Sequence, residues 1–136
     1  MPYEVEKTDE EWKSELSSDR YAVLRKAATE APFSGSLLHV DAEGVFRCGG
    51  CGQRLFTSAQ KFDSGCGWPS FDDCEAGTVI EREDRSLFRR RTEILCSRCG
   101  GHLGHVFNDG PTATGLRYCV NSLSLTYEPD ASPTAS

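Results

Sequence analysis

The chain has 136 residues, enough for one domain with a hydrophobic core of its own. Its net charge of -6 and its pI near 5.0 argue against nucleic acid or an anionic membrane as the main partner. No apolar run approaches the roughly 18 residues of a membrane span, and residues 1–6 lack the basic and apolar segments of a signal peptide. We therefore expect a cytoplasmic protein with no membrane or nucleic-acid partner. We also expect it to be a monomer.

Two short helices are predicted within the first thirty residues. Thr8 followed by Glu11 matches a capping box, in which each residue satisfies a free backbone N–H of the other, and an i, i+4 apolar pair follows it. A second helix is expected to begin near Ser18. Pro32, with Gly35 just after it, ends the helical pattern.

Strands separated by turns are predicted for the rest of the chain, which makes the fold mainly β. The expected strands span residues 37–40, 45–47, 78–83, 86–95 and 116 to about 127. Glycine-rich loops are expected at 49–52, 63–67 and 100–104, and turns at 41–44, 83–85 and 108–111. We expect one domain over residues 1–129, and a disordered tail over 130–136, which is mostly Ser, Thr, Ala and Pro.

Seven cysteines carry most of the chemical information in this sequence. In a reducing compartment, cysteines serve as metal ligands or redox catalysts more often than as a disulfide framework, and an odd number leaves at least one of them unpaired. Four of them fall in two Cys-x-x-Cys pairs, which leaves Cys66, Cys74 and Cys119. This division indicates one metal site and separate thiol chemistry.

The two Cys-x-x-Cys pairs, Cys48 with Cys51 and Cys96 with Cys99, predict a structural zinc site. Four thiolates complete a tetrahedral zinc site with no open position. The 44 residues between the pairs exceed the usual zinc-finger spacing, so the ion would join two distant hairpins by closing a long loop. Thioredoxin-like redox pairs or free thiols are the alternatives, but neither pair shows the strand-then-helix pattern of a redox motif.

Residues 117–121 predict a strand that presents a thiol on a polar face. Side chains at i, i+2 and i+4 share one face, so Arg117, Cys119 and Asn121 are expected to point the same way, with Tyr118 and Val120 toward the core. A neighbouring arginine raises the thiolate fraction of a cysteine. The alternative is a small buried cysteine with no chemical role, but polar residues on both sides of Cys119 favour a nucleophile.

Two further segments contain residue types that suit thiol redox chemistry. Cys66 lies between two glycines and beside Trp68, and glycines allow a backbone to move a thiol toward another sulfur. His102 and His105 are candidate proton donors near neutral pH. The alternatives are a turn with a buried tryptophan, and loop histidines that are idle or replace a zinc ligand. Together with Cys119, these residues indicate reduction of a polar oxidised group on a small apolar side chain.

Over roughly residues 8–128, these motifs and their order resemble methionine sulfoxide reductase B. The motifs that carry the resemblance are Cys48-x-x-Cys51, Ser64-Gly65-Cys66-Gly67-Trp68-Pro69-Ser70-Phe71, Cys96-x-x-Cys99-Gly100, His102-Leu103-Gly104-His105-Val106-Phe107, Asp109-Gly110-Pro111 and Thr114-Gly115-Leu116-Arg117-Tyr118-Cys119-Val120-Asn121-Ser122. The resemblance implies two antiparallel sheets with short N-terminal helices and a structural zinc. It also implies reduction of the R epimer of methionine sulfoxide in peptides and proteins.

The resemblance implies a role for each matched residue. Cys119 attacks the sulfoxide sulfur and becomes a sulfenic acid, Cys66 condenses with it to a disulfide, and thioredoxin reduces that disulfide. His105 protonates the sulfoxide oxygen. The other matched positions are hydrogen-bonding residues (His102, Asp109, Asn121), a cation near the thiolate (Arg117) and substrate-binding residues (Trp68, Phe107).

Cys66 and Cys74 depart from the commonest family pattern in different ways. Many members carry threonine at the position of Cys66, so the cysteine here supports the disulfide route. Cys74 has no role in the pattern; we expect a packing thiol, and a backup resolving role is the alternative.

Two other classes of function remain open. A non-enzymatic zinc-ribbon module would explain the four paired cysteines but would leave Cys66, Cys119 and the histidines idle. A cysteine hydrolase would use Cys119 with one histidine and would not need Cys66. A zinc deaminase is disfavoured because its His-x-Glu and Pro-Cys-x-x-Cys signature is absent.

Overall fold

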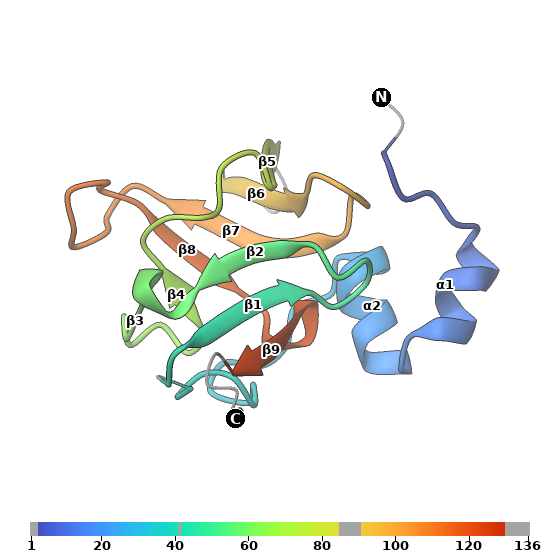
Figure 1. Cartoon of the computed structure of the whole chain (residues 1–136), viewed down its shortest axis with the longest axis horizontal. Helices are drawn as coiled ribbons and strands as arrows, with labels where there is room; N and C mark the ends of the chain where they lie inside the picture. The colour runs from blue at the N-terminus through green and yellow to red at the C-terminus, as the bar shows by residue number, and fades with distance from the viewer. Residues whose placement is uncertain (1–2, 41, 85–90, 130–136) are drawn as a thin grey trace, which may run out of the picture.

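The computed structural model describes residues 3–40, 42–84 and 91–129, and within them the chain forms two antiparallel sheets and two short helices (Figure 1). The three-stranded sheet has the order β2-β1-β9 and the six-stranded sheet the order β3-β4-β8-β7-β6-β5. The elements are α1 (Asp9–Glu15), α2 (Ser18–Lys26), β1 (Gly44–Cys48), β2 (Arg54–Thr57), β3 (Lys61–Phe62), β4 (Ser70–Phe71), β5 (Val79–Asp84), β6 (Arg91–Cys96), β7 (His102–Phe107), β8 (Arg117–Val120) and β9 (Leu125–Pro129).

Both predicted helices are present, and they pack together at one end of the sheets (Figure 1). The capping box is formed at the start of α1: Thr8 N–H donates to Glu11 Oε1 at 2.9 Å, and Glu11 N–H donates to Thr8 Oγ1 at 3.1 Å. From α2, Arg20 donates to the carbonyls of Leu123 and Leu125, and Arg25 donates to that of Cys99. These contacts attach the helices to the sheets near Cys99, one of the four predicted metal ligands, and near the start of β9.

The predicted strand at residues 37–40 is wrong, because this segment consists of turns. The N–H of Leu38 bonds to the carbonyl of Gly35, and the N–H of Val40 bonds to that of Leu37. Leu38 is nevertheless buried, so the apolar pattern is explained by core packing and not by a strand. A short apolar run does not distinguish between these two situations.

The predicted strand from 116 to about 127 is two strands, and they belong to different sheets. β8 lies in the six-stranded sheet and β9 in the three-stranded sheet, with a 3₁₀ turn at Ser122–Ser124 between them. Asn121 Nδ2 donates to Leu103 O at 3.1 Å, and Ser124 Oγ donates to His102 O at 2.8 Å. Such side-chain bonds to the backbone compete with a strand ladder, and they turn the chain from one sheet to the other.

Other boundaries shift by smaller amounts. The strands expected at 45–47 and 78–83 correspond to β1 and β5, whereas residues 83 and 84 belong to β5 and not to a turn. The strand β7 was not predicted: it begins at His102, inside the loop expected at 100–104. The strands β2, β3 and β4, with at most four residues each, were not predicted. Residues 86–90 of the strand expected at 86–95, residues 41 and 85 of two expected turns, and the tail 130–136 lie outside the described residues.

The main hydrophobic core lies between the two sheets and fixes the orientation of β8. Phe56 of the three-stranded sheet stacks on Phe71 of the six-stranded sheet with ring centroids 4.2 Å apart, and it meets the edge of Tyr118 at 5.9 Å. Tyr118 and Val120 are buried, as predicted for the core face of their strand. Because neighbouring side chains on a strand point to opposite faces, Arg117 and Cys119 face away from this core. No helix of the described residues is long and apolar enough to cross a membrane.

Candidate active site and metal centre

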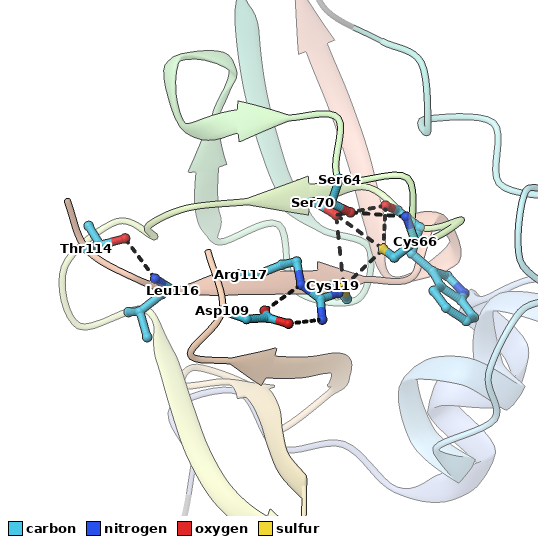
Figure 2. Close-up of polar contacts among 9 residues, drawn as sticks. Ser64, Cys66, Ser70, Asp109, Thr114, Leu116, Arg117 and Cys119 are labelled. Carbon is cyan, nitrogen blue, oxygen red and sulfur yellow. Dashed lines mark hydrogen bonds and ion pairs between the residues drawn. The ribbon is translucent and has the colours of Figure 1, made fainter. Parts of the chain in front are cut away.

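Two free thiols, Cys66 and Cys119, meet at the centre of the six-stranded sheet (Figure 2). Their sulfur atoms are 3.1 Å apart. Cys119 lies in β8, where it is opposite His105 of β7 and Ser70 of β4. The Ser70 hydroxyl is 3.4 Å from the sulfur of Cys66 and 4.0 Å from that of Cys119. The fold therefore joins two thiols that are 53 residues apart in the sequence.

The loop between β3 and β4 delivers Cys66 to this position. Gly65 and Gly67 have φ angles of 76° and 97°, a backbone region that favours glycine. A Cβ atom at Gly67 would lie 2.7 Å from Cβ of Pro32, so no larger residue fits there without movement. The N–H of Cys66 donates to Ser64 Oγ at 3.2 Å, which closes a local turn. The two glycines thus shape the loop that places the sulfur against Cys119.

The two thiols ionise as a pair. The hydrogen bond with Cys119 lowers the pKa of Cys66 to about 4, and the same bond raises the pKa of Cys119. One thiolate in the pair is stabilised because the other thiol donates to it, and a second ionisation would bring two negative charges together. The pair therefore holds a thiolate at neutral pH, which is the reactive form of cysteine.

Arg117 is held beside the pair by several contacts (Figure 2). Its Nη1 donates to Cys119 Sγ at 2.9 Å, while Nε and Nη2 donate to the two carboxylate oxygens of Asp109 at 2.8 and 3.0 Å. Its guanidinium carbon lies 4.5 Å from the ring centroid of Phe107. Arg117 lowers the pKa of Asp109, which keeps that carboxylate charged. The carboxylate and the aromatic ring thus orient a fixed cation toward the sulfur of Cys119.

A cavity of about 140 Å³ opens at Cys119. Its walls include Trp68, His105, Phe107, Arg117, Cys119 and Asn121. Six of the residues predicted for the site therefore line one cavity. The volume suits a single side chain, and the lining combines aromatic walls with a few polar groups, as is typical of small-molecule sites.

The two predicted histidines occupy different positions. His105 lines the cavity, whereas His102 is buried, with Nδ1 2.6 Å from Glu93 Oε2. A one-residue register shift between β6 and β7 brings the two imidazole rings to 5.8 Å from each other. His102 therefore supports the site from behind the cavity wall.

Glu93 is a residue of this network that sequence reasoning missed. It is buried on β6, and its other oxygen, Oε1, accepts two hydrogen bonds from Arg82, at 2.8 and 3.1 Å. A buried carboxylate requires such partners, because burial disfavours an unpaired charge. No local signal marks it, because the strand expected at 86–95 contains several other charged residues.

Glu30 is a second residue that sequence reasoning missed. Its carbonyl accepts a hydrogen bond from the Trp68 indole at 3.0 Å, and its N–H donates to Asn121 Oδ1 at 3.0 Å. Its carboxylate accepts from the N–H of Leu123 at 3.0 Å. This buried residue thereby connects two walls of the cavity, and nothing in the local sequence pattern marks it.

Cys74 lies on the other side of β8 from the thiol pair. Its sulfur is 3.8 Å from the hydroxyl of Tyr118, whose side chain points to the core face. Burial raises the pKa of Cys74. This placement supports a packing role and argues against a backup resolving role, because the strand separates Cys74 from Cys119.

The four remaining cysteines form a compact cluster that could hold a metal ion. The sulfur atoms of Cys48, Cys51, Cys96 and Cys99 all lie within 4.8 Å of one another, with Cys48–Cys99 at 3.7 Å and Cys51–Cys96 at 3.6 Å. A tetrahedron with metal–sulfur bonds of about 2.3 Å has edges of about 3.8 Å. The residues therefore fit a tetrahedral ion that connects the end of β1 in one sheet to the end of β6 in the other. Among the described residues, no histidine joins this cluster.

Solved structures offer a likeness in fold. The crystal structure of the Mis18 "Yippee-like" domain superposes with a TM-score of 0.53 and 21% sequence identity, and it covers 65% of this chain and 98% of that domain. At this level of identity the likeness concerns the fold alone.

Comparison with known sequences identifies the family. The SelR domain matches residues 16–129. Proteins named peptide methionine sulfoxide reductase MsrB are 54% identical in Methanosarcina barkeri, covering 91% of this chain and 88% of the relative, and 53% identical in Leptospira interrogans, covering 94% and 98%. The relative of the same name from Bradyrhizobium diazoefficiens is 55% identical, covering 92% of this chain and 91% of the relative. The chain therefore belongs to the SelR-domain family of MsrB-type methionine sulfoxide reductases.

Proposed function

We propose that this protein is a peptide-methionine (R)-S-oxide reductase, which reduces the R-sulfoxide of methionine in peptides and proteins to methionine. The observation that carries the proposal is the pair of sulfur atoms 3.1 Å apart, one of which opens into a cavity for one side chain. Two adjacent thiols supply the two electrons that a sulfoxide requires. The names of the relatives support peptide methionine sulfoxide as the substrate. The R epimer is the one that the family resemblance implies.

In this proposal the oxidised side chain enters the cavity beside Cys119. Trp68 and Phe107 form apolar walls that suit the methyl end of the side chain, while His105 and Asn121 offer polar groups to the sulfoxide oxygen. Glu30 keeps Trp68 and Asn121 in position through its backbone N–H and carbonyl. The substrate sulfur would then meet the sulfur of Cys119.

The first chemical step is oxidation of Cys119. Cys119 passes its proton to the Cys66 thiolate across their hydrogen bond. The resulting Cys119 thiolate attacks the sulfoxide sulfur, and His105 donates a proton to the oxygen as the S–O bond weakens. The oxygen passes to Cys119 as a sulfenic acid, and methionine leaves with two additional electrons. Arg117, 2.9 Å from the sulfur of Cys119, favours the thiolate that begins this step. Glu93 and His102 support the ring of His105 from behind.

The second step resolves the sulfenic acid. The thiol of Cys66 displaces hydroxide from Cys119, water leaves, and a Cys66–Cys119 disulfide forms. The sulfur atoms approach from 3.1 Å to a bond of about 2.05 Å, so a small movement of the glycine-flanked loop suffices. A dithiol protein of the thioredoxin type then returns two electrons and two protons by thiol exchange.

We further infer that the four-cysteine cluster holds one structural zinc ion. Thiolates at these separations suit zinc, and a site with four protein ligands has no open position for chemistry. When bound, the ion stabilises the fold by cross-linking the two sheets. The residues of the thiol pair lie outside this cluster, so the reaction does not involve the metal.

The experiment that tests the function uses separate R and S epimers of a peptide methionine sulfoxide, with thioredoxin and its reductase for regeneration. We expect turnover of the R epimer alone, and loss of turnover in Cys119→Ser with metal and fold intact. No turnover of either epimer by a folded, zinc-loaded protein would favour a non-enzymatic zinc-ribbon module. Isolation of a Cys66–Cys119 disulfide after one turnover would exclude a cysteine hydrolase.

A further inference from the structure

We propose that a second cavity, distinct from the substrate cavity, is the docking groove of the protein reductant, and that the reductant attacks the sulfur of Cys66. This inference rests on the proposed function. The second cavity has a volume of about 500 Å³ and is lined by residues that include Phe62, Asp63, Cys66, Asp109, Pro111 and Arg117. Among its lining residues, Arg117 alone also lines the substrate cavity.

The two cavities divide the thiol pair between them. Cys119 lines the cavity that contains Trp68 and His105, whereas Cys66 lines the second cavity and not the first. Arg117 lies at the boundary, with its guanidinium against Cys119. After the disulfide forms, a molecule in the second cavity therefore faces the sulfur of Cys66 first.

The second cavity is larger than the substrate cavity and has an exposed rim, so a macromolecule can reach it. Its volume of about 500 Å³ compares with about 140 Å³ for the cavity that takes one side chain. Its rim residues Asp63, Gly65 and Pro111 are exposed, and a Cβ atom at Gly65 would have no neighbour within 4 Å. The rim thus leaves room for the backbone of a partner close to Cys66. A dithiol protein whose attacking cysteine lies on a surface loop fits this shape.

The chemistry also favours attack at Cys66. Cys119 is only 9% exposed, whereas Cys66 is half-buried. The thiolate of the reductant forms a new S–S bond to Cys66 Sγ, and the bond to Cys119 breaks with its electron pair on Cys119 Sγ. Arg117 Nη1, 2.9 Å from that sulfur, stabilises the departing thiolate. The second thiol of the reductant then releases Cys66 and forms the disulfide of the reductant.

This arrangement returns the enzyme directly to its starting state. The sulfur that leaves is that of Cys119, which is already beside Arg117 and in the substrate cavity. Substrate and reductant approach from separate cavities, so methionine sulfoxide should not compete with the reductant for a binding surface.

The test uses one bulky substitution in the groove and a matched control in the same loop. Pro111→Tyr fills the second cavity, whereas Ala113→Tyr adds the same side chain at an exposed position that does not line it. Turnover is driven either by thioredoxin or by dithiothreitol, which needs no docking surface. We expect Pro111→Tyr to raise the KM for thioredoxin about tenfold, with dithiothreitol-driven turnover and the KM for the sulfoxide peptide unchanged. Ala113→Tyr should behave like the unmodified protein.

An unchanged KM for thioredoxin in Pro111→Tyr, or an equal loss with both reductants, would overturn the docking assignment. A second measurement traps the oxidised enzyme with a thioredoxin that retains only its attacking cysteine. Peptide mapping should find the mixed disulfide on Cys66, and a mixed disulfide on Cys119 would refute the direction of attack. If the unmodified protein reduces no sulfoxide even with dithiothreitol, the proposed function itself fails, and the two failures are thereby distinguished.

Discussion

The sulfur of Cys66 lies 3.1 Å from the sulfur of Cys119, so each thiol of the reduced enzyme is the hydrogen-bond partner of the other. This relationship determines the ionisation of both groups and the short path to a disulfide. It also depends on two segments that the sequence separates by 53 residues.

The thiolate of the pair should be detectable by its reactivity in mild acid. The hydrogen bond from Cys119 lowers the pKa of Cys66 to about 4, so the thiolate is present above that pH and is lost as the pH falls through it. We expect iodoacetamide to alkylate Cys66 readily at pH 6 in the unmodified protein, as measured by peptide mass mapping.

The matched variant is Cys119→Ala, which removes the donor. The pKa of Cys66 then returns toward about 8.5, and its thiolate fraction at pH 6 falls below about 1 per cent. Equal alkylation rates in the two proteins would show that Cys119 does not stabilise the thiolate. Cys74, whose pKa is raised by burial, serves as an internal control for unreactive thiols.

Replacement of Cys66 should separate the first chemical step from recycling. Cys66→Ser retains Cys119 and the cavity, so one methionine per enzyme should be released in a single turnover, while turnover with thioredoxin should stop. Cys74→Ser is the control, and it should turn over normally because Tyr118 and the strand β8 separate it from the pair. Sustained thioredoxin-driven turnover in Cys66→Ser would contradict the two-thiol scheme.

Replacement of Glu93 should reduce stability and activity more than replacement of its surface partner, Arg82. Glu93→Gln weakens the contact with the buried His102, and we expect a loss of about 1–3 kcal/mol in the free energy of unfolding and a lower rate of sulfoxide reduction. Arg82→Gln removes only the largely exposed end of the same network and should change stability by less than about 1 kcal/mol. Urea denaturation and single-turnover rates measure both effects. Similar results for the two variants would argue against a role for the Glu93–His102 contact.

Removal of one metal ligand should lower the stability of the fold more than the rate of sulfoxide reduction. Cys48→Ser leaves three thiolates in a cluster that connects β1 to β6, so the zinc content should fall from one ion toward none. We expect a loss of at least about 2 kcal/mol, or roughly 6–10 °C in Tm. Metal analysis and calorimetry provide the measurements. A Cys48→Ser protein that melts like the unmodified one would show that the cluster does not stabilise the fold.

Much of the fold could be predicted where the signal is local. The capping box of Thr8 and Glu11 and the strands β1 and β5 depend on residues close together in the chain, and they are present as expected. The strand predicted at 37–40 was wrong because a short apolar run does not distinguish a strand from a buried turn. The long strand ending near 127 was wrong because its break depends on distant partners. The side chain of Asn121, for example, bonds to Leu103 and to Glu30 and ends the strand β8.

The sequence by itself determined the chemical inventory of this protein: two cysteine pairs with metal-ligand spacing, a thiol beside an arginine, a second thiol between glycines, and the motifs of its family. Only the tertiary structure decided which of these groups meet. It brought Cys66 to Cys119, placed Cys74 behind the strand, put Glu93 and Glu30 behind the cavity walls, and opened two cavities at one thiol pair. The physical reason is that residue type and spacing act locally, whereas burial, hydrogen-bond partners and cavity shape arise from contacts between segments far apart in the chain.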